Sequence, residues 1–277
     1  MSANSTKTTK TKKFNTKKRS ILEIWDEVQR VQSDFCFPHE SSAYYLSENW
    51  INHTQTVLDV GTGNGYYLEK IARLFPDKAY TAVDFSAEFI EIAKAEVACN
   101  SIKFSVSNFF DLQGQFDFMI MRLFWQHLKN TEIAQAFAQM EGLTKPGGSV
   151  LIVDAYDEAR SFVPDLPEFR KVISAYTQQQ ISIADCDRDV VNTIRNWAGE
   201  KDNWRIGLDI PFVMPSTISG HLQLYMRVYD LWIALFEHMG ELDMDFEPAK
   251  KELAGWKNER DAFTQAGIRV MRLDRVA

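Results

Sequence analysis

Three glycines at alternate positions follow an apolar, strand-like run that contains one acidic residue. Gly61, Gly63 and Gly65 come directly after residues 57–60 (VLDV) and precede a segment with the pattern of an amphipathic helix. Because glycine lacks a Cβ, such a turn lets a ligand approach the backbone closely. The GxGxG spacing differs from the GxGxxG of dinucleotide sites. The run predicts a ligand site that points away from NAD and towards a nucleoside with an amino-acid tail.

A second acidic residue ends the next strand-like run. Asp84 closes residues 79–84 and lies 23 residues after Gly61. An acid about 20 residues after such a loop is typical of contacts to ribose hydroxyls, and a carboxylate can accept two hydrogen bonds from a vicinal diol. The alternative is an ordinary residue beside the helix N-cap Ser86. The glycine run favours the ribose interpretation.

Two further segments occur in the order that one enzyme family uses. Residues 107–111 (SNFFD) follow the third predicted strand, and residues 116–128 (FDFMIMRLFWQHL) hold the fourth strand and its turn. A Lys-Pro-Gly-Gly turn follows at 145–148. Together with the glycine run and Asp84, these segments resemble the class I S-adenosylmethionine-dependent methyltransferases of the small-molecule type. The resemblance covers roughly residues 40–155 and the last strand.

The resemblance implies that S-adenosylmethionine is the cofactor and indicates where it lies. Its methionine end would meet the glycine loop, whose N–H groups and following helix terminus are expected to receive the carboxylate. The adenine would lie on Asn108 and Phe109; the family often has Asp in place of Asn108, but an amide oxygen can accept the same hydrogen bond. The implied cofactor-binding residues are Asp59, Gly61, Thr62, Gly63, Gly65, Asp84, Phe85, Asn108, Phe109, Arg122 and Leu123.

His127 is the candidate catalytic residue. The resemblance places it near the methyl group, where an imidazole could act as general base. Methyl transfer is an in-line displacement that needs mainly alignment and desolvation, so a positioning or helix-capping role is the alternative. No metal is expected, because the acidic residues of 237–245 lack the spacing of a calcium loop.

A parallel sheet is needed to position these residues. Strand-like runs alternate with helical runs of about 10–15 residues, which is typical of βαβ units with helices on both faces. We expect strands at 56–60, 79–84, 103–106, 116–121 and 149–154, and helices at 64–75, 86–99 and 131–143. Residues 21–50 predict a helix that Pro38 interrupts, with a second short helix from Ser41 to about Ile51.

The predicted fold class is α/β, a Rossmann-like, doubly wound, mostly parallel sheet with a helical N-terminal segment and a helical insertion, or lid, before the last strand. The strand rhythm stops after Asp154 and returns at 266–273. The expected domains are a disordered basic tail (1–20), a Rossmann-like cofactor-binding core (21–158 with 265–277) and a helical insertion that forms the substrate lid (159–264).

The insertion is expected to supply the pocket for the methyl acceptor. His221, Tyr225, Tyr229 and Trp232 share one face of a predicted helix, where aromatic rings could stack a planar acceptor or enclose a cation. The alternative is that this stripe packs onto the sheet. The candidate substrate residues are Tyr45, Tyr156, His221 and Tyr225, with Tyr44, Trp50 and Arg160 as further candidates around the mouth.

Composition limits the partners. Residues 1–19 carry seven basic residues and no acid, whereas the chain has 31 basic and 38 acidic residues in all. An acidic body disfavours nucleic acid, and the tail reads as a solubilising segment or as a tether to an anionic partner. The absence of a long apolar run and of a signal segment predicts no membrane contact. Three cysteines without CxxC spacing fit the reducing cytoplasm, and an exposed aromatic helix would allow a homodimer.

The sequence therefore predicts a cytoplasmic methyltransferase that uses S-adenosylmethionine to methylate O or N of a small molecule. One alternative is an RNA or protein methyltransferase tethered by the basic tail, although residues 121–124 read MRLF where nucleic-acid amino methyltransferases have an Asn-Pro-Pro-Tyr-like tetrapeptide. The other is a non-catalytic S-adenosylmethionine-binding module. The acceptor is not identified by the sequence.

Overall fold

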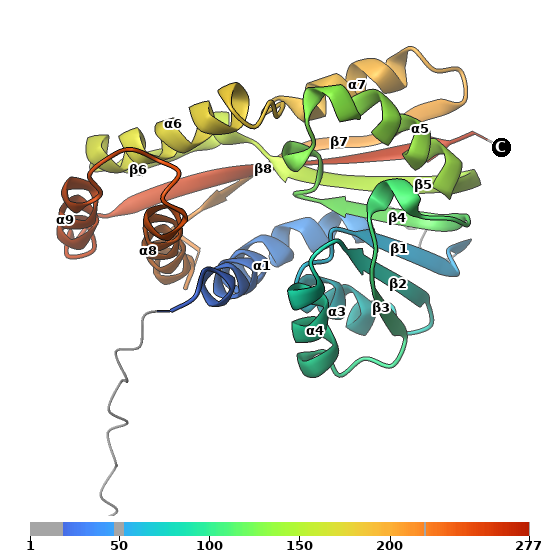
Figure 1. Ribbon diagram of the computed structural model, residues 1–277, viewed down its shortest axis with the longest axis horizontal. Helices are drawn as coiled ribbons and strands as arrows, with labels where there is room; N and C mark the ends of the chain where they lie inside the picture. The colour runs from blue at the N-terminus through green and yellow to red at the C-terminus, as the bar shows by residue number, and fades with distance from the viewer. Residues whose placement is uncertain (1–18, 47–52, 219, 277) are drawn as a thin grey trace, which may run out of the picture.

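A computed structural model describes residues 19–46, 53–218 and 220–276, and it is organised around an eight-stranded sheet (Figure 1). The strands are β1 (Thr56–Val60), β2 (Ala79–Asp84), β3 (Ile102–Val106), β4 (Phe116–Arg122), β5 (Thr144–Ala155), β6 (Ser161–Val163), β7 (Trp204–Pro215) and β8 (Phe263–Arg275). The helices are α1 (Ile21–Tyr45), α3 (Tyr66–Leu74), α4 (Ala87–Glu96), α5 (Ile133–Leu143), α6 (Pro167–Ser182), α7 (Val190–Gly199), α8 (His221–Met239) and α9 (Glu247–Trp256). Short 3-10 turns are η1 (Phe109–Asp111), η2 (Trp125–His127), η3 (Asn130–Glu132) and η4 (Asp157–Ala159).

The strand order β3-β2-β1-β4-β5-β8-β6, with β7 also paired to β8, confirms the predicted α/β fold class. Strands β1 to β5 are parallel to their neighbours, and β8 runs antiparallel to β5. Successive residues of a strand point to opposite faces. Phe118 and Ile120 of β4 accordingly join the core under α1 and α3, whereas Met119 and Met121 join the core under α5 and α7. Both faces of the sheet are therefore covered, as the apolar strands predicted.

Strand β8 connects the sheet to the segment that was expected to be a helical insertion. β5 pairs with Ile268–Asp274 and β6 with Phe263–Gln265, while β7 pairs along Gln265–Arg275. Because a strand has two edges, β6 must continue the line of β5 and β7 must lie on the opposite edge. Figure 1 shows α6, α8 and α9 grouped at the β6 end of β8, with α1 between them and the parallel core. The closing strand predicted at 266–273 is confirmed, with longer bounds.

The insertion is less purely helical than predicted, since residues 159–264 contain β6 and β7 as well as four helices. β7 alternates apolar residues at 204, 206, 208, 210 and 212 with Arg205, Gly207, Asp209 and Pro211, so its pattern is that of a strand. Gly207 and Pro211 are tolerated at a sheet edge, and the pairing register shifts at Gly207. The period-2 pattern of residues 204–212 is therefore a strand signal that the prediction of a helical insertion missed.

The predicted break at Pro38 is wrong, because α1 runs without interruption from Ile21 to Tyr45. Proline removes one helical hydrogen bond, but α1 buries residues on both sides of Pro38, including Phe35 and Ala43, against α3 and α8. Part of the second helix predicted there, residues 47–52, lies outside the described residues, as does the basic tail up to residue 18. Within the described ranges, no helix combines the length and apolar character that crossing a membrane requires.

Candidate active site

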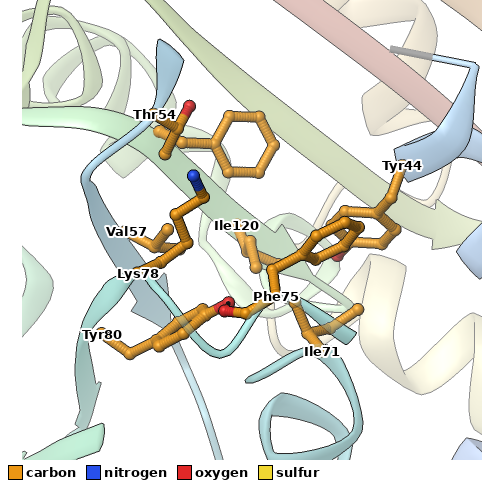
Figure 2. A pocket seen from close by; sticks show the side chains of 9 residues that line it. Tyr44, Thr54, Val57, Ile71, Phe75, Lys78, Tyr80 and Ile120 are labelled. Atoms are coloured by element: carbon orange, nitrogen blue, oxygen red, sulfur yellow. Dashed lines mark hydrogen bonds between the residues drawn. The ribbon is translucent and has the colours of Figure 1, made fainter. Parts of the chain in front are cut away.

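A cavity with a volume of about 740 Å³ lies beside the chemistry-bearing residues. It lies where the parallel strands end, against the loops that follow β1, β2, β3, β4 and β5, and α1, α6 and α8 close it from the other side. This is where open α/β sheets bind ligands, and the volume falls in the range of small-molecule sites. A second pocket, at the opposite ends of the strands beside Tyr44, Val57 and Lys78, holds only about 10 Å³ (Figure 2). That space suits about one water molecule.

The glycine loop is closed by hydrogen bonds within the protein. The N–H groups of Gly61 and Thr62 donate to the carbonyl of Val83 at 2.9 and 3.0 Å, and that of Gly65 donates to the Thr62 carbonyl at 3.1 Å. The Gly63 N–H donates to Asp84 Oδ2 at 2.8 Å. These loop N–H groups therefore already donate to acceptors within the protein.

Helix α1 contacts the glycine loop through hydrogen bonds that the sequence did not indicate. Gln29 accepts a hydrogen bond from the Asn64 N–H at 2.9 Å, and Asn64 Nδ2 donates to Asp26 at 2.7 Å. A Cβ on Gly63, whose φ is +57°, would lie 2.3 Å from the Gln29 amide oxygen. Gly63 is thus required by its backbone conformation and by the close approach of α1.

Gly65 differs from the other two glycines, because it does not line the cavity. Its φ is +71°, and a Cβ there would lie 2.8 Å from the ring of Phe104. Gly65 therefore lets the start of α3 pack against β3, and its contribution to a cofactor site would be indirect. The other ten predicted cofactor residues all line the cavity.

Asp84 combines a structural and a ligand-facing position. Its Oδ1 accepts from the Ser86 N–H at 2.9 Å while Oδ2 holds Gly63, and each oxygen keeps a second lone pair. The neighbouring Phe85 is 83% exposed at the edge of the cavity. A large apolar side chain left open beside a cavity is available to cover a ligand.

The predicted adenine loop also reaches the cavity. The Asn108 side-chain oxygen accepts from the Phe110 N–H at 3.0 Å and caps η1. That oxygen has one remaining lone pair for an amine. Phe109 is buried and meets the ring of Phe124 edge to face at 5.2 Å. The two residues thus present an acceptor and an apolar ring side by side.

Arg122 is a largely buried cation that lines the same cavity as the glycine loop. Its Nε donates to both carboxylate oxygens of Glu40, at 2.9 and 3.2 Å, and the guanidinium lies 4.5 Å over the ring of Tyr67. Burial works against its charge, but the pairing with Glu40 more than offsets burial and raises the pKa of Arg122. Its Nη2 is buried without a partner, as is the Thr62 hydroxyl. An unpaired buried donor is unfavourable, so both atoms are suited to a polar ligand group.

Two more residues at this end carry unusual features. Burial raises the pKa of Asp59 to about 6. Leu123, which follows β4, has a φ of +52°, a left-handed conformation that is unfavourable for a branched side chain. Its N–H donates to the Val153 carbonyl at 2.7 Å, which holds the turn in place. Such strain often accompanies a functional site.

His127 of η2 lines the same cavity and is open to it, although protein surrounds the ring on most sides. This environment lowers its pKa to about 4, through burial first and the positive charge of Arg188 second. The imidazole is therefore neutral at pH 7 and can accept a proton or a hydrogen bond.

The far end of the cavity is formed by the insertion. Arg188 Nη2 donates to Asp157 at 2.5 Å, and Arg160 donates to the other oxygen of Asp157 at 2.8 Å. The Arg160 guanidinium lies 5.0 Å from the centre of the Trp232 ring. Arg188 sits in the loop between α6 and α7, where no pattern in the sequence indicated a site. Arg160 was predicted only as a further candidate around the mouth, and Trp232 as a member of the aromatic face on the predicted helix.

The four predicted substrate residues are not among those that line the cavity. Tyr225 is buried, with its hydroxyl donating to the Met214 carbonyl at 2.6 Å and accepting from the Ala266 N–H at 3.0 Å. His221 is buried against His39, with ring centres 5.7 Å apart. Tyr45 is exposed beside Phe75. The α8 stripe therefore packs largely onto the protein body, as the alternative interpretation held.

Tyr156 lies in the turn after β5, and its N–H donates to the Gly267 carbonyl at 3.0 Å. That bond fixes the backbone next to Asp157 without bringing the Tyr156 ring to the cavity. The further candidate Trp50 lies outside the described residues. Residues of the insertion that do reach the cavity include Ile173, Tyr176, Thr177, Arg188, Met214, Trp232, Leu235 and Phe236.

The chain is similar to several known proteins. Residues 57–148 match a family model described as a methyltransferase domain. A malonyl-acyl-carrier-protein O-methyltransferase of Priestia megaterium is 32% identical over 110 residues, which cover 38% of this chain and 39% of the relative. A second such enzyme, from Ilyobacter polytropus, is 26% identical over 168 residues, covering 55% and 61%. The solved structure of the MccD protein has a TM-score of 0.49 and 14% identity, covering 82% of this chain and 95% of its own.

The chain spans about two fifths to three fifths of the length of these two curated relatives. The matched segment contains the glycine loop, Asp84, the 107–111 loop and the turn with His127. The strand order and the position of the cavity fit the same type of domain. The comparisons thus identify a methyltransferase domain within residues 57–148, the segment that holds all eleven candidate cofactor residues and His127.

Proposed function

We propose that the protein transfers a methyl group from S-adenosylmethionine to an oxygen or nitrogen atom of a small molecule. The observation that carries this proposal is the single cavity of about 740 Å³ that collects ten predicted cofactor residues together with His127. When bound, the cofactor supplies the methyl group on a sulfonium that is a good leaving group. The protein's part is to bind, align and exclude water.

The residues at the glycine-loop end fit the amino-acid tail of this cofactor. Arg122 offers its unpartnered Nη2 to a carboxylate, and Thr62 offers a buried hydroxyl. Asp59 offers a buried carboxylate to an ammonium group. The free donors thus match the carboxylate of the tail, and the acid matches its ammonium group. In this proposal Arg122 and Thr62, and not the loop N–H groups, bind the carboxylate.

The residues that follow β2 and β3 fit the nucleoside. Asp84 retains lone pairs that can accept from ribose hydroxyls, while Phe85 and Phe109 offer apolar rings to the adenine. At the other side His127, neutral at pH 7, either takes the acceptor's proton or positions the acceptor by a hydrogen bond. The O-methyltransferase names of the two curated relatives favour oxygen as the acceptor atom.

The tail assignment can be tested with two forms of the cofactor. We would titrate S-adenosylmethionine and its decarboxylated analogue into the wild type and Arg122→Met, using calorimetry. One charge-assisted hydrogen bond is expected to make the wild type prefer the carboxylate form roughly tenfold or more. The two cofactor forms are compared within each variant, and Arg122→Met is expected to lose the preference for the carboxylate form. A general loss of stability would weaken the binding of both forms alike and would leave the preference unchanged. Equal binding of both forms by the wild type would contradict the assignment.

Catalysis is tested separately, by following label from the cofactor into a small-molecule extract. Transfer to a small molecule supports the proposed function, whereas binding of the cofactor without transfer to any acceptor favours the non-catalytic module. We further infer a cytoplasmic location and a small-molecule acceptor from the composition of the chain, with its acidic body.

A further inference from the structure

The end of the cavity that the cofactor would leave free holds two guanidinium groups. Arg160 and Arg188 share one carboxylate, Asp157, which accepts from both. Two further acids lie close by, so this end has no excess of positive charge, although backbone N–H groups donate to both. Asp154 accepts from the N–H groups of Gln126 and Ala155, at 3.3 and 2.8 Å. Glu132, which lines the cavity, accepts from the Lys129 N–H at 2.8 Å.

Arg188 has one donor that nothing in the protein satisfies. Its Nη1 donates to the Gln126 side-chain oxygen and its Nη2 to Asp157, both at 2.5 Å, whereas Nε is buried without a partner. Among the described residues that line the cavity, the other orphaned side-chain atoms are Arg122 Nη2 and the Thr62 hydroxyl, both at the glycine-loop end. The cavity therefore has one unpaired cationic donor at each end. A buried guanidinium hydrogen is best satisfied by an anion.

Flat apolar side chains surround this donor. Tyr176 is stacked on Phe236, with ring centres 4.4 Å apart and planes at 21°, and both line the cavity. Trp232 lies beneath the Arg160 guanidinium. A ligand held here would meet aromatic rings along its body and a guanidinium at its tip, a combination that suits a planar acid.

The position of Arg188 places such a ligand next to the reacting end of the cavity. Gln126, which Arg188 binds, is the direct neighbour of His127 in η2. Arg188 is also close enough to His127 for its charge to lower the pKa of the imidazole, so an acid anchored on Arg188 would lie near His127.

We propose that the methyl acceptor is a flat, aromatic-type carboxylic acid whose carboxylate is held by Arg188. The inference rests on the proposed function, because that function assigns the glycine-loop end to the cofactor and leaves this end to the acceptor. Arg188 is a binding residue in this account and selects acids over neutral analogues.

The test compares acids with their own amides as probes. The pairs are phenylacetate with phenylacetamide, 4-hydroxybenzoate with 4-hydroxybenzamide, and indole-3-acetate with indole-3-acetamide. Dissociation constants are measured by ligand-observed NMR on the full chain, with and without saturating S-adenosylhomocysteine. The variants are Arg188→Gln and, as a control with the same loss of charge, Arg205→Gln on the exposed part of β7.

We expect at least one acid to bind the wild type and Arg205→Gln roughly tenfold more tightly than its amide, and Arg188→Gln to lose that preference. Amides that bind as well as acids, a preference that survives in Arg188→Gln, or no binding of any acid at millimolar concentration would each overturn the proposal. A failure of S-adenosylhomocysteine to bind would instead count against the proposed function. The acid preference of the chain without it would still be measured, so the two failures are distinguishable.

Discussion

The buried pair of Glu40 and Arg122 gives the sharpest stability prediction. Glu40 is 0% exposed, and the Arg122 side chain is 11% exposed. Replacing Arg122 with Met leaves the Glu40 carboxylate in the interior, close to Tyr67, without its cation. Breaking a buried ion pair in this way costs about 3–5 kcal/mol. We therefore expect Arg122→Met to lower the free energy of unfolding by that amount.

The double variant Glu40→Gln with Arg122→Met should be far less destabilised. Replacing both charges removes the desolvation penalty of each ion, so such replacements are often close to neutral. If the double variant costs about 1 kcal/mol, the coupling energy between the two positions is at least roughly 3 kcal/mol. Glu40 belongs to α1 and Arg122 to β4, so this coupling measures how firmly α1 is fixed over the sheet.

Urea unfolding at pH 7, with linear extrapolation, measures all four free energies. The matched control is the exposed pair of Glu91 and Lys94 on α4, 3.3 Å apart, for which the same cycle should give no more than about 0.5 kcal/mol. The reasoning is refuted if Arg122→Met costs less than about 1 kcal/mol. It is refuted equally if the double variant costs as much as the two single variants together.

Three further predictions concern the site. Gly63→Ala should lower the free energy of unfolding by about 1–2 kcal/mol, because φ is +57° and the new Cβ would meet Gln29. The control Gly199→Ala, which has open space around it, should not lower it, and urea unfolding measures both. The affinity for S-adenosylmethionine should rise from pH 5 to pH 7, because the ammonium group of the cofactor favours ionised Asp59, whose pKa without ligand is about 6. Calorimetry measures this rise, which should be absent in Asp59→Asn. If His127 is the base, its neutral form persists down to its pKa of about 4, so the plot of kcat against pH should show no decrease near pH 6.5 from this group. The variant His127→Gln should lower kcat and leave the affinity for the cofactor unchanged.

The core of the fold, and the gathering of ten candidate cofactor residues around one cavity, could be predicted because their signals are local in sequence. Gly61 and Gly63 follow a strand directly, and Asp84 ends the next one, so strand order alone brings them to one edge of a parallel sheet. The apolar pattern of β4 likewise predicted a buried strand. For these residues, the residue type, the spacing in the sequence and the predicted strand or turn all indicate the same position in the fold.

The acceptor end could not be predicted, because it is made by contacts between distant segments. Arg188 meets Asp157 and Gln126 only through the folding of the insertion, and Gln29 reaches the glycine loop only because α1 crosses it. The stripe on α8 has helical periodicity, but periodicity does not tell a helix face that packs inward from one that lines a cavity. Tyr225 is buried in the core and does not line the cavity, although it was predicted to contact the substrate.

The central claim is that the cavity over the glycine loop holds S-adenosylmethionine with its ribose on Asp84. Titration of S-adenosylmethionine into the wild type and Asp84→Ala in a calorimeter tests it most directly. The account predicts saturable heat for one equivalent in the wild type, and a dissociation constant weakened roughly tenfold or more in Asp84→Ala, since two ribose hydrogen bonds to a charged group are lost. No heat of binding in the wild type, or an Asp84→Ala variant that binds as tightly as the wild type, would contradict it.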